Sequence, residues 1–94
     1  TQETLTNLDS ALGWLAANGV SDPIARVVAV TAAPDRAQAR GIREILPFAE
    51  SVGGRYSLWS AVGLPLAVRC GPQAFEALLD GAHAMDRHFL SRPY

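Results

Sequence analysis

Apolar residues recur at helical spacing near the start of the chain. Steps of three and four residues separate the members of this series, which are Leu5, Leu8, Leu12 and Leu15. The spacing places them on one face of a helix, so we predict a helix over residues 4–17. Thr4 or Thr6 can cap its start, and Asn18-Gly19 is a typical helix end.

A second apolar series follows the break at Gly71-Pro72, a pair that suits the start of a helix. Its members again share helical spacing and are Phe75, Leu78, Leu79, Ala82, Met85 and Phe89. The series predicts a strongly amphipathic helix over residues 73–90. The apolar run before the break, residues 62–70, is ambiguous, but Pro65 favours the first turn of a helix over a central strand.

Short β-branched runs lie between these two helices. Residues 26–31 predict a buried strand of a parallel sheet, and a second short strand is predicted within residues 42–48. A weak helical pattern over residues 34–40 separates the two strands, and residues 49–61 are predicted to be loop and turn. The predicted order of helix, strand, helix, strand, helix is typical of an α/β layered fold.

The composition supports a globular fold and excludes several classes of partner. Of the 94 residues, 49% are apolar and 18% are charged, which argues against disorder. Eight basic and nine acidic residues give a net charge of −1 without a basic stripe, so we expect no nucleic-acid partner. The apolar runs are short and interrupted, so we expect no membrane partner. Cys70 is the only cysteine, which fits a reducing compartment and makes a structural zinc site improbable.

The run Gly53-Gly54-Arg55 is the strongest candidate for chemistry. Glycine adopts backbone angles that other residues avoid, and it lets a ligand approach the main chain closely. An arginine held beside open space presents an always-charged group with five donors. The pattern suits a site that stabilises developing negative charge on a small substrate. The alternative is a structural arginine at the surface or the core border, paired with a carboxylate.

Five other side chains are assigned structural roles. His83 and His88 are predicted to serve helix packing or the surface, because neither has a Ser, Cys or metal-ligand partner at diagnostic spacing. Cys70 is predicted to be a small buried apolar residue. Trp14 and Trp59 are predicted to be packing residues.

Three segments carry a family resemblance, in matching order and spacing across the whole chain. The central segment, residues 50–63 (ESVGGRYSLWSAVG), is the most specific. The flanking segments are residues 81–89 (GAHAMDRHF) and residues 1–4 (TQET). Together they resemble the glucose-6-phosphate isomerase (phosphoglucose isomerase) family, in which TQET matches the end of a sugar-phosphate loop that reads SKTxxTxET.

The resemblance implies that residues 1–94 are part of the first sugar-isomerase (SIS) domain. The implied fold is a partial three-layer α/β/α sandwich of the SIS type, flavodoxin-like, with short parallel strands and amphipathic helices. The implied activity is an aldose–ketose isomerisation between glucose 6-phosphate and fructose 6-phosphate through a cis-enediolate, in glycolysis and gluconeogenesis. The resemblance further implies a cytoplasmic homodimer that needs no metal or organic cofactor, with active sites near the subunit interface.

Four residues match functional positions of the family. Arg55 matches the arginine that stabilises the enediolate, and Gly54 matches the glycine whose main chain lies near the reacting carbons. Thr1 matches a threonine that contacts the substrate phosphate. Glu3 matches a glutamate that orients a catalytic histidine supplied by the neighbouring subunit. From the residues alone, Thr1 could equally be a frayed terminus, and Glu3 a first-turn glutamate favoured by the helix dipole.

The family's glutamate base, ring-opening histidine and C-terminal lysine belong to later segments. We therefore expect the chain to be a piece of a longer isomerase, whose remainder completes the sheet. We expect the isolated 94 residues to be inactive and, without the SKT residues, severely weakened in phosphate affinity. Two alternatives remain: a non-catalytic sugar-phosphate-binding SIS module, and a structural fragment that associates with other chains.

Overall fold

The computed structural model describes residues 1–92, which fall into two compact units. The first unit comprises Thr1–Ala49, and the second begins at Glu50. The first unit contains helices and a small parallel sheet, and the second contains helices only. The α/β class predicted from the sequence is confirmed, and the observed elements are consistent with part of an α/β sandwich. The assignment of residues 1–94 to one partial domain stays a prediction.

The first unit opens with helix α1 (Gln2–Ala17), which confirms the predicted N-terminal helix and starts two residues earlier. The hydroxyl of Thr1 caps it by accepting a hydrogen bond of 3.3 Å from the N–H of Thr4. Asn18 caps the other end, and Gly19 follows at a φ of 86°, a conformation that favours glycine. The predicted end at Asn18-Gly19 is confirmed, whereas the predicted cap at Thr4 or Thr6 is wrong, because the helix begins earlier and Thr1 caps it.

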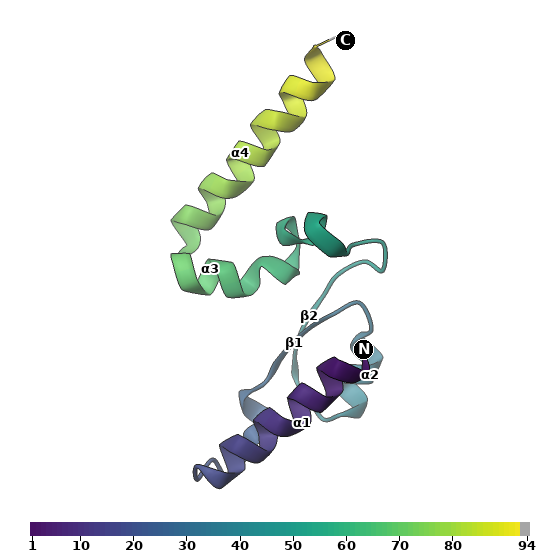
Figure 1. Ribbon diagram of the computed structural model, residues 1–94, viewed down its shortest axis with the longest axis vertical. Helices are drawn as coiled ribbons and strands as arrows, with labels where there is room; N and C mark the ends of the chain where they lie inside the picture. Colours follow the sequence, from purple (N-terminus) through teal and green to yellow (C-terminus); the bar gives the residue numbers. More distant parts are fainter. Residues whose placement is uncertain (93–94) are drawn as a thin grey trace. The chain divides into compact units, whose positions relative to one another are not determined.

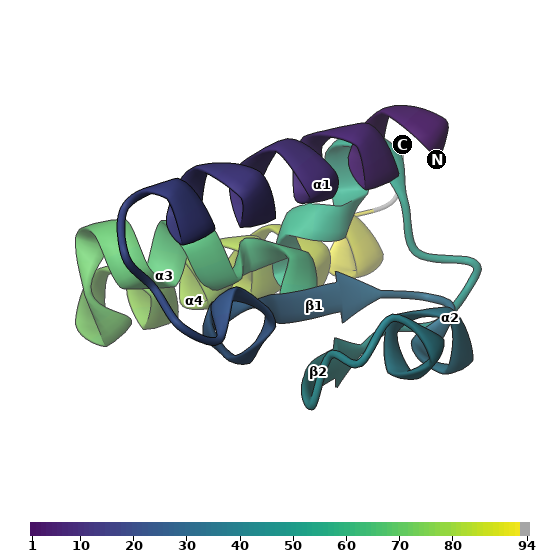
Figure 2. The same ribbon diagram turned by 90° about the horizontal axis from the view of Figure 1, so that it is seen from below.

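The rest of the first unit is a βαβ arrangement (Figure 1). A short 3-10 helix, η1 (Pro23–Arg26), leads into strand β1 (Val28–Thr31), helix α2 (Pro34–Ala39) and strand β2 (Glu44–Pro47). The strands pair in parallel, and Figure 2 shows them running in the same direction. The predicted strands and their parallel pairing are confirmed. β1 starts later than predicted because Pro23–Arg26 form the 3-10 turn.

The apolar centre of the first unit lies at α2 and the turn after it. Ala37 and Ile42 are the buried apolar residues of the described chain, and the Ile42 N–H donates to the Ala37 carbonyl at 3.1 Å. An ion pair between Arg40 and Asp9 joins the end of α2 to α1. The predicted burial of β1 is wrong among the described residues, because Val28 is 49% exposed.

The second unit is built from short and long helices. Two 3-10 helices, η2 (Gly54–Trp59) and η3 (Ala61–Gly63), precede helix α3 (Leu64–Cys70) and helix α4 (Pro72–Ser91). Figure 1 shows α3 and α4 meeting at a corner, where Gly71 has a φ of 87°. The prediction of helices after residue 64 is confirmed. The prediction of loop over residues 49–61 is wrong for η2.

Three predictions of burial are also wrong among residues 1–92. Cys70 was predicted to be buried, but it is an exposed free thiol at the end of α3. Trp14 and Trp59 were predicted to be packing residues, but they are 66% and 46% exposed. Within residues 1–92, no helix is both long and apolar enough to cross a membrane.

Candidate functional site

The backbone before Arg55 makes a sharp change of direction. Gly53 is extended, with a φ of −175°, which any residue can adopt. Gly54 has a φ of 62°, in the left-handed region where side chains are strained. A Cβ added at Gly54 would meet no atom within 4 Å, so the space beside this backbone is open. Only the second glycine of the pair is therefore required by the conformation.

Arg55 stands directly after this turn, at the start of η2, and its side chain is exposed. Among residues 1–92 it makes no ion pair and no hydrogen bond through its guanidinium. The alternative interpretation was an arginine paired with a carboxylate, and no carboxylate of the described chain pairs with Arg55. The guanidinium is available to an anionic group that approaches the open side of the turn.

Two serines hold the segment that carries Arg55. Ser57 is 9% exposed, and its hydroxyl donates to the carbonyl of Gly54 at 2.7 Å. The hydroxyl of Ser60 donates to the carbonyl of Ser57 at 2.6 Å and accepts from the N–H of Val62 at 3.2 Å. Serine hydroxyls can satisfy backbone groups that a short 3-10 segment leaves unpaired. These bonds add to the i→i+3 backbone bonds of the short 3-10 helix.

Gly63 is needed for space rather than for backbone freedom. A Cβ at this position would lie 2.4 Å from the carbonyl oxygen of Leu58 and 2.7 Å from the ring of Phe75. Both distances are far below a van der Waals contact. Gly63 therefore lets the end of η3 sit directly between η2 and the first turn of α4, which fixes the serine-held segment against that helix.

The side of η2 that carries Tyr56 and Trp59 borders an open hollow of about 740 Å³. The other lining residues belong to α4 and are Leu79, Ala82, His83, Met85 and Asp86. Arg55 does not line this hollow. His83 is exposed there, in agreement with its predicted surface role, and His88 is exposed further along the helix.

Thr1 and Glu3 lie at the start of α1, in the first unit. The Thr1 hydroxyl lies 2.8 Å from the Thr4 hydroxyl and also accepts from the Thr4 N–H, so it is an ordered cap. The pKa of the Glu3 carboxyl is lowered by a hydrogen bond from its own backbone N–H and, to a smaller degree, by one from the Thr1 hydroxyl. A carboxylate in the first turn of a helix is also favoured by the helix dipole. Glu3 is therefore an exposed and firmly ionised group.

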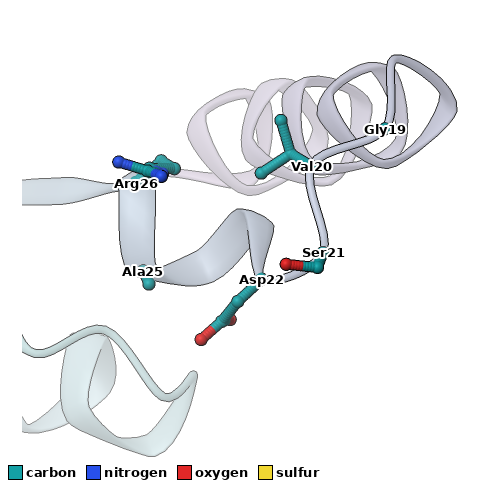
Figure 3. A pocket seen from close by; sticks show the side chains of 6 residues that line it. All are labelled: Gly19, Val20, Ser21, Asp22, Ala25 and Arg26. Atoms are coloured by element: carbon teal, nitrogen blue, oxygen red, sulfur yellow. The ribbon is translucent and has the colours of Figure 1, made fainter.

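A smaller hollow of about 360 Å³ lies after α1, between Gly19 and Arg26 (Figure 3). In the figure, the Asp22 carboxylate and the Arg26 guanidinium do not point toward one another. None of the four predicted site residues lines it. Residues 1–92 also hold no group of three or more His, Cys, Asp or Glu able to bind a metal.

The predicted site residues fall into two pairs. Thr1 and Glu3 belong to the first unit, and Gly54 and Arg55 to the second. The sequence analysis missed Ser57 and Gly63, which support the second pair. The sequence did contain a signal for Ser57. This serine follows Gly54 by three residues, and a serine hydroxyl often bonds to the carbonyl of the residue three positions earlier. Gly63 had no such signal, since the ring that needs its space comes from a later helix.

Comparison with known proteins gives one consistent family. The family model described as phosphoglucose isomerase matches residues 1–94. The chain is 58% identical over 92 residues to a glucose-6-phosphate isomerase of Novosphingobium aromaticivorans, covering 96% of this chain and 18% of that protein. It is 57% identical to the same enzyme of Rhizorhabdus wittichii, covering 99% of this chain and 19% of that protein.

The corresponding enzyme of Zymomonas mobilis is 53% identical over 92 residues, with 96% of this chain and 18% of that protein covered. No solved structure gives a significant match. The chain thus spans about 18% of the length of the relatives that it matches. The match includes the glycine–arginine turn and its serine-held helix, and on these grounds the chain belongs to the phosphoglucose isomerase family.

Proposed function

We propose that the chain is part of a glucose-6-phosphate isomerase, which interconverts glucose 6-phosphate and fructose 6-phosphate. The observation that carries this proposal is the family match over residues 1–94, joined to an unpaired arginine at a left-handed glycine turn. The family implies sugar-phosphate substrates and a larger isomerase chain. The parent enzyme is proposed to be a cytoplasmic homodimer with active sites near the subunit interface.

Arg55 is proposed to stabilise the enediolate. Moving a proton between C1 and C2 of the open-chain sugar leaves negative charge on the adjacent oxygen. A cation aimed beforehand at that oxygen stabilises the transition state more than the ground state, by about 3 kcal/mol for a single donor. The exposed guanidinium has no carboxylate partner in the described chain, so none there would compete with the oxyanion.

Gly54 is proposed to let the sugar approach the main chain. Its φ of 62° and the empty space on its Cβ side leave the backbone accessible beside Arg55. A side chain at this position would strain the turn and occupy the same space. The glycine thus serves both the direction of the turn and the access of the substrate.

Thr1 and Glu3 are proposed to act at other parts of the substrate site. The Thr1 hydroxyl lies at the N-terminus of α1, where free N–H groups and the helix dipole favour a phosphate. Glu3 is proposed to hold a histidine of the partner subunit in one tautomer, a role that needs an ionised carboxylate. The lowered pKa of Glu3 keeps it in that form at neutral pH.

The 94 residues alone are proposed to be inactive. The proposed proton-transfer base is a glutamate of another segment of the parent enzyme. Several apolar side chains are exposed among the described residues, including Val28, Leu46 and Val68, and the remainder of the isomerase chain is proposed to cover them.

The test is a coupled isomerase assay of the full-length parent enzyme with Arg55→Ala. We expect kcat to fall by about 100- to 1000-fold, with a smaller change in KM, because the lost contact forms only in the transition state. Arg69→Ala, which removes another exposed arginine of the same unit, is the matched control and should keep kcat. Unchanged kcat in Arg55→Ala would refute the assignment. A parent without isomerase activity would favour the sugar-phosphate-binding module.

A further inference from the structure

We propose that Ser57 is a positioning residue for Arg55, an inference that rests on the proposed function of Arg55. The Arg55 guanidinium has no partner among residues 1–92, so no contact of its own fixes where the side chain emerges. Its direction is set by the backbone on which it stands. An arginine that must meet a developing oxyanion needs that backbone to be held in one orientation.

The weak point of this backbone is the peptide between Gly54 and Arg55. Gly54 sits at a φ of 62°, and glycine populates both signs of φ with little steric cost. A Cβ at Gly54 would meet nothing within 4 Å, so no packed side chain or backbone supports the glycine on that side. The intrinsic preference of glycine therefore does not set the orientation of the peptide.

The Ser57 hydroxyl restricts this freedom further than the backbone bonds of η2 do. It donates to the Gly54 carbonyl at 2.7 Å, and Ser57 is 9% exposed, so water competes poorly for the bond. The peptide is trans, so the Arg55 N–H points opposite to the Gly54 carbonyl. Together with the i→i+3 backbone bonds of the 3-10 helix, this hydrogen bond restricts the peptide plane from which the Arg55 side chain departs.

Ser57 is itself held from the far side. Its carbonyl accepts from the Ser60 hydroxyl at 2.6 Å and from the Ser60 N–H at 2.9 Å. These bonds do not touch the peptide before Arg55. Ser60 is therefore a matched control, because its hydroxyl makes the same kind of bond one turn further from the arginine.

The first experiment compares Ser57→Ala and Ser60→Ala in the full-length parent enzyme by steady-state kinetics. We expect Ser57→Ala to lower kcat about tenfold or more and to change KM less than about threefold, since the arginine acts on charge that forms in the transition state. Ser60→Ala should lower the melting temperature yet change kcat less than about threefold. Equal losses of kcat in the two variants would overturn the proposal.

The second experiment tests whether Ser57 acts through Arg55. In the Arg55→Ala background, adding Ser57→Ala should change kcat less than about twofold, because a positioning residue has nothing left to position. A full, multiplicative loss would overturn the proposal. Ser57→Thr keeps a hydroxyl donor, so its kcat should be higher than that of Ser57→Ala. Ser57→Cys is close to serine in size but has a weak donor, so its kcat should lie between those of Ser57→Ala and the wild type.

A third measurement does not depend on isomerase activity. Hydrogen exchange of residues 54–59, followed by mass spectrometry in the full-length parent, should be faster in Ser57→Ala than in the wild type. Unchanged exchange would refute the positioning role whatever the enzyme catalyses. Faster exchange in a parent that lacks isomerase activity would keep the backbone role of Ser57 and reject only the proposed function of Arg55.

Discussion

The two compact units keep their conformation by different means. In the first unit, β1 and β2 pair through their backbones in parallel register, and α1 has a cap at each end. In the second, the segment with Arg55 depends on serine hydroxyls bonded to carbonyls and on one glycine that leaves room for an aromatic ring. A long helix or a paired strand spreads its stability over many bonds, whereas a short 3-10 segment depends more on a few residues. Substitutions should therefore be tolerated unequally between the units.

Gly63→Ala should give the largest loss of stability. If it did not, the contrast between the two units would be wrong. The added Cβ would lie 2.4 Å from the Leu58 carbonyl oxygen, which cannot move without disturbing η2, and 2.7 Å from the Phe75 ring. We expect a loss of about 3 kcal/mol in the free energy of unfolding, at the upper end for overpacked sites. Denaturant unfolding of the full-length parent measures it.

Gly81→Ala is the control for Gly63→Ala. Gly81 lies inside α4, and a Cβ there would meet nothing within 4 Å. Alanine is the better helix former by about 1 kcal/mol, so this variant should be neutral or slightly stabilised. A comparable loss of unfolding free energy in both variants would mean that any added methyl group destabilises the second unit. The contact with Phe75 would then not be the specific cause.

Gly54→Ala should cost less than Gly63→Ala, for a different reason. The space is open at Gly54, but its φ of 62° is unfavourable for a residue with a Cβ, by about 1 to 2 kcal/mol. Gly53→Ala should be close to neutral, because that residue is extended and has the same open space. Thermal unfolding of the two variants sharpens the comparison. A larger loss in Gly53→Ala would contradict the assignment of the turn to the second glycine.

The regular elements could be predicted from the sequence because each carries its own periodicity. The leucine series before Asn18 predicted α1, and the apolar series after Gly71 predicted α4. The glycine and proline positions marked their ends. The 3-10 helices escaped prediction because they are short and show no apolar period. Hydroxyl bonds at Ser57 and Ser60 support η2 and the start of η3, and an apolar pattern does not report such bonds.

Burial was predicted less well than secondary structure. Periodicity tells which face of a helix or strand is apolar, but it does not tell which surface covers that face. Val28 lies within a short apolar run and Cys70 ends another, yet both are exposed among residues 1–92. The candidate site shows the same contrast. The glycine–arginine turn could be predicted and Ser57 had a local sequence signal, whereas the space that Gly63 leaves for the Phe75 ring needed the structure.

The ion pair between Asp9 and Arg40 tests the first unit. The side chains are 61% and 40% exposed, so solvent screens their attraction. We expect a coupling of about 0.5 kcal/mol in a double-mutant cycle, and less at high salt. A coupling above about 2 kcal/mol would mean that the first unit also concentrates its stability in single contacts, which would remove the contrast between the units.

The smallest expected effect is the pH dependence contributed by Glu3. Its pKa lies below the ordinary value of 4.5, mainly through a hydrogen bond from its own backbone N–H and secondly through the Thr1 side chain. The folded chain thus binds this proton more weakly than the unfolded chain does. Glu3 therefore stabilises the fold above the unfolded pKa, and this contribution is lost as the pH falls through the lower, folded pKa.

Glu3→Gln removes this titration and should make the loss of stability between about pH 6 and pH 3 slightly smaller than in the wild type. Urea unfolding midpoints of the full-length parent at the two pH values measure the difference. Thr1→Ala should shift the pKa of Glu3 back toward its ordinary value, because it removes the second of the two hydrogen bonds. If Glu3→Gln and the wild type lost stability equally, the carboxylate would not be tied to the start of α1. The case for an ordered, ionised group at that helix end would then fail, although the arginine turn of the second unit would be untouched.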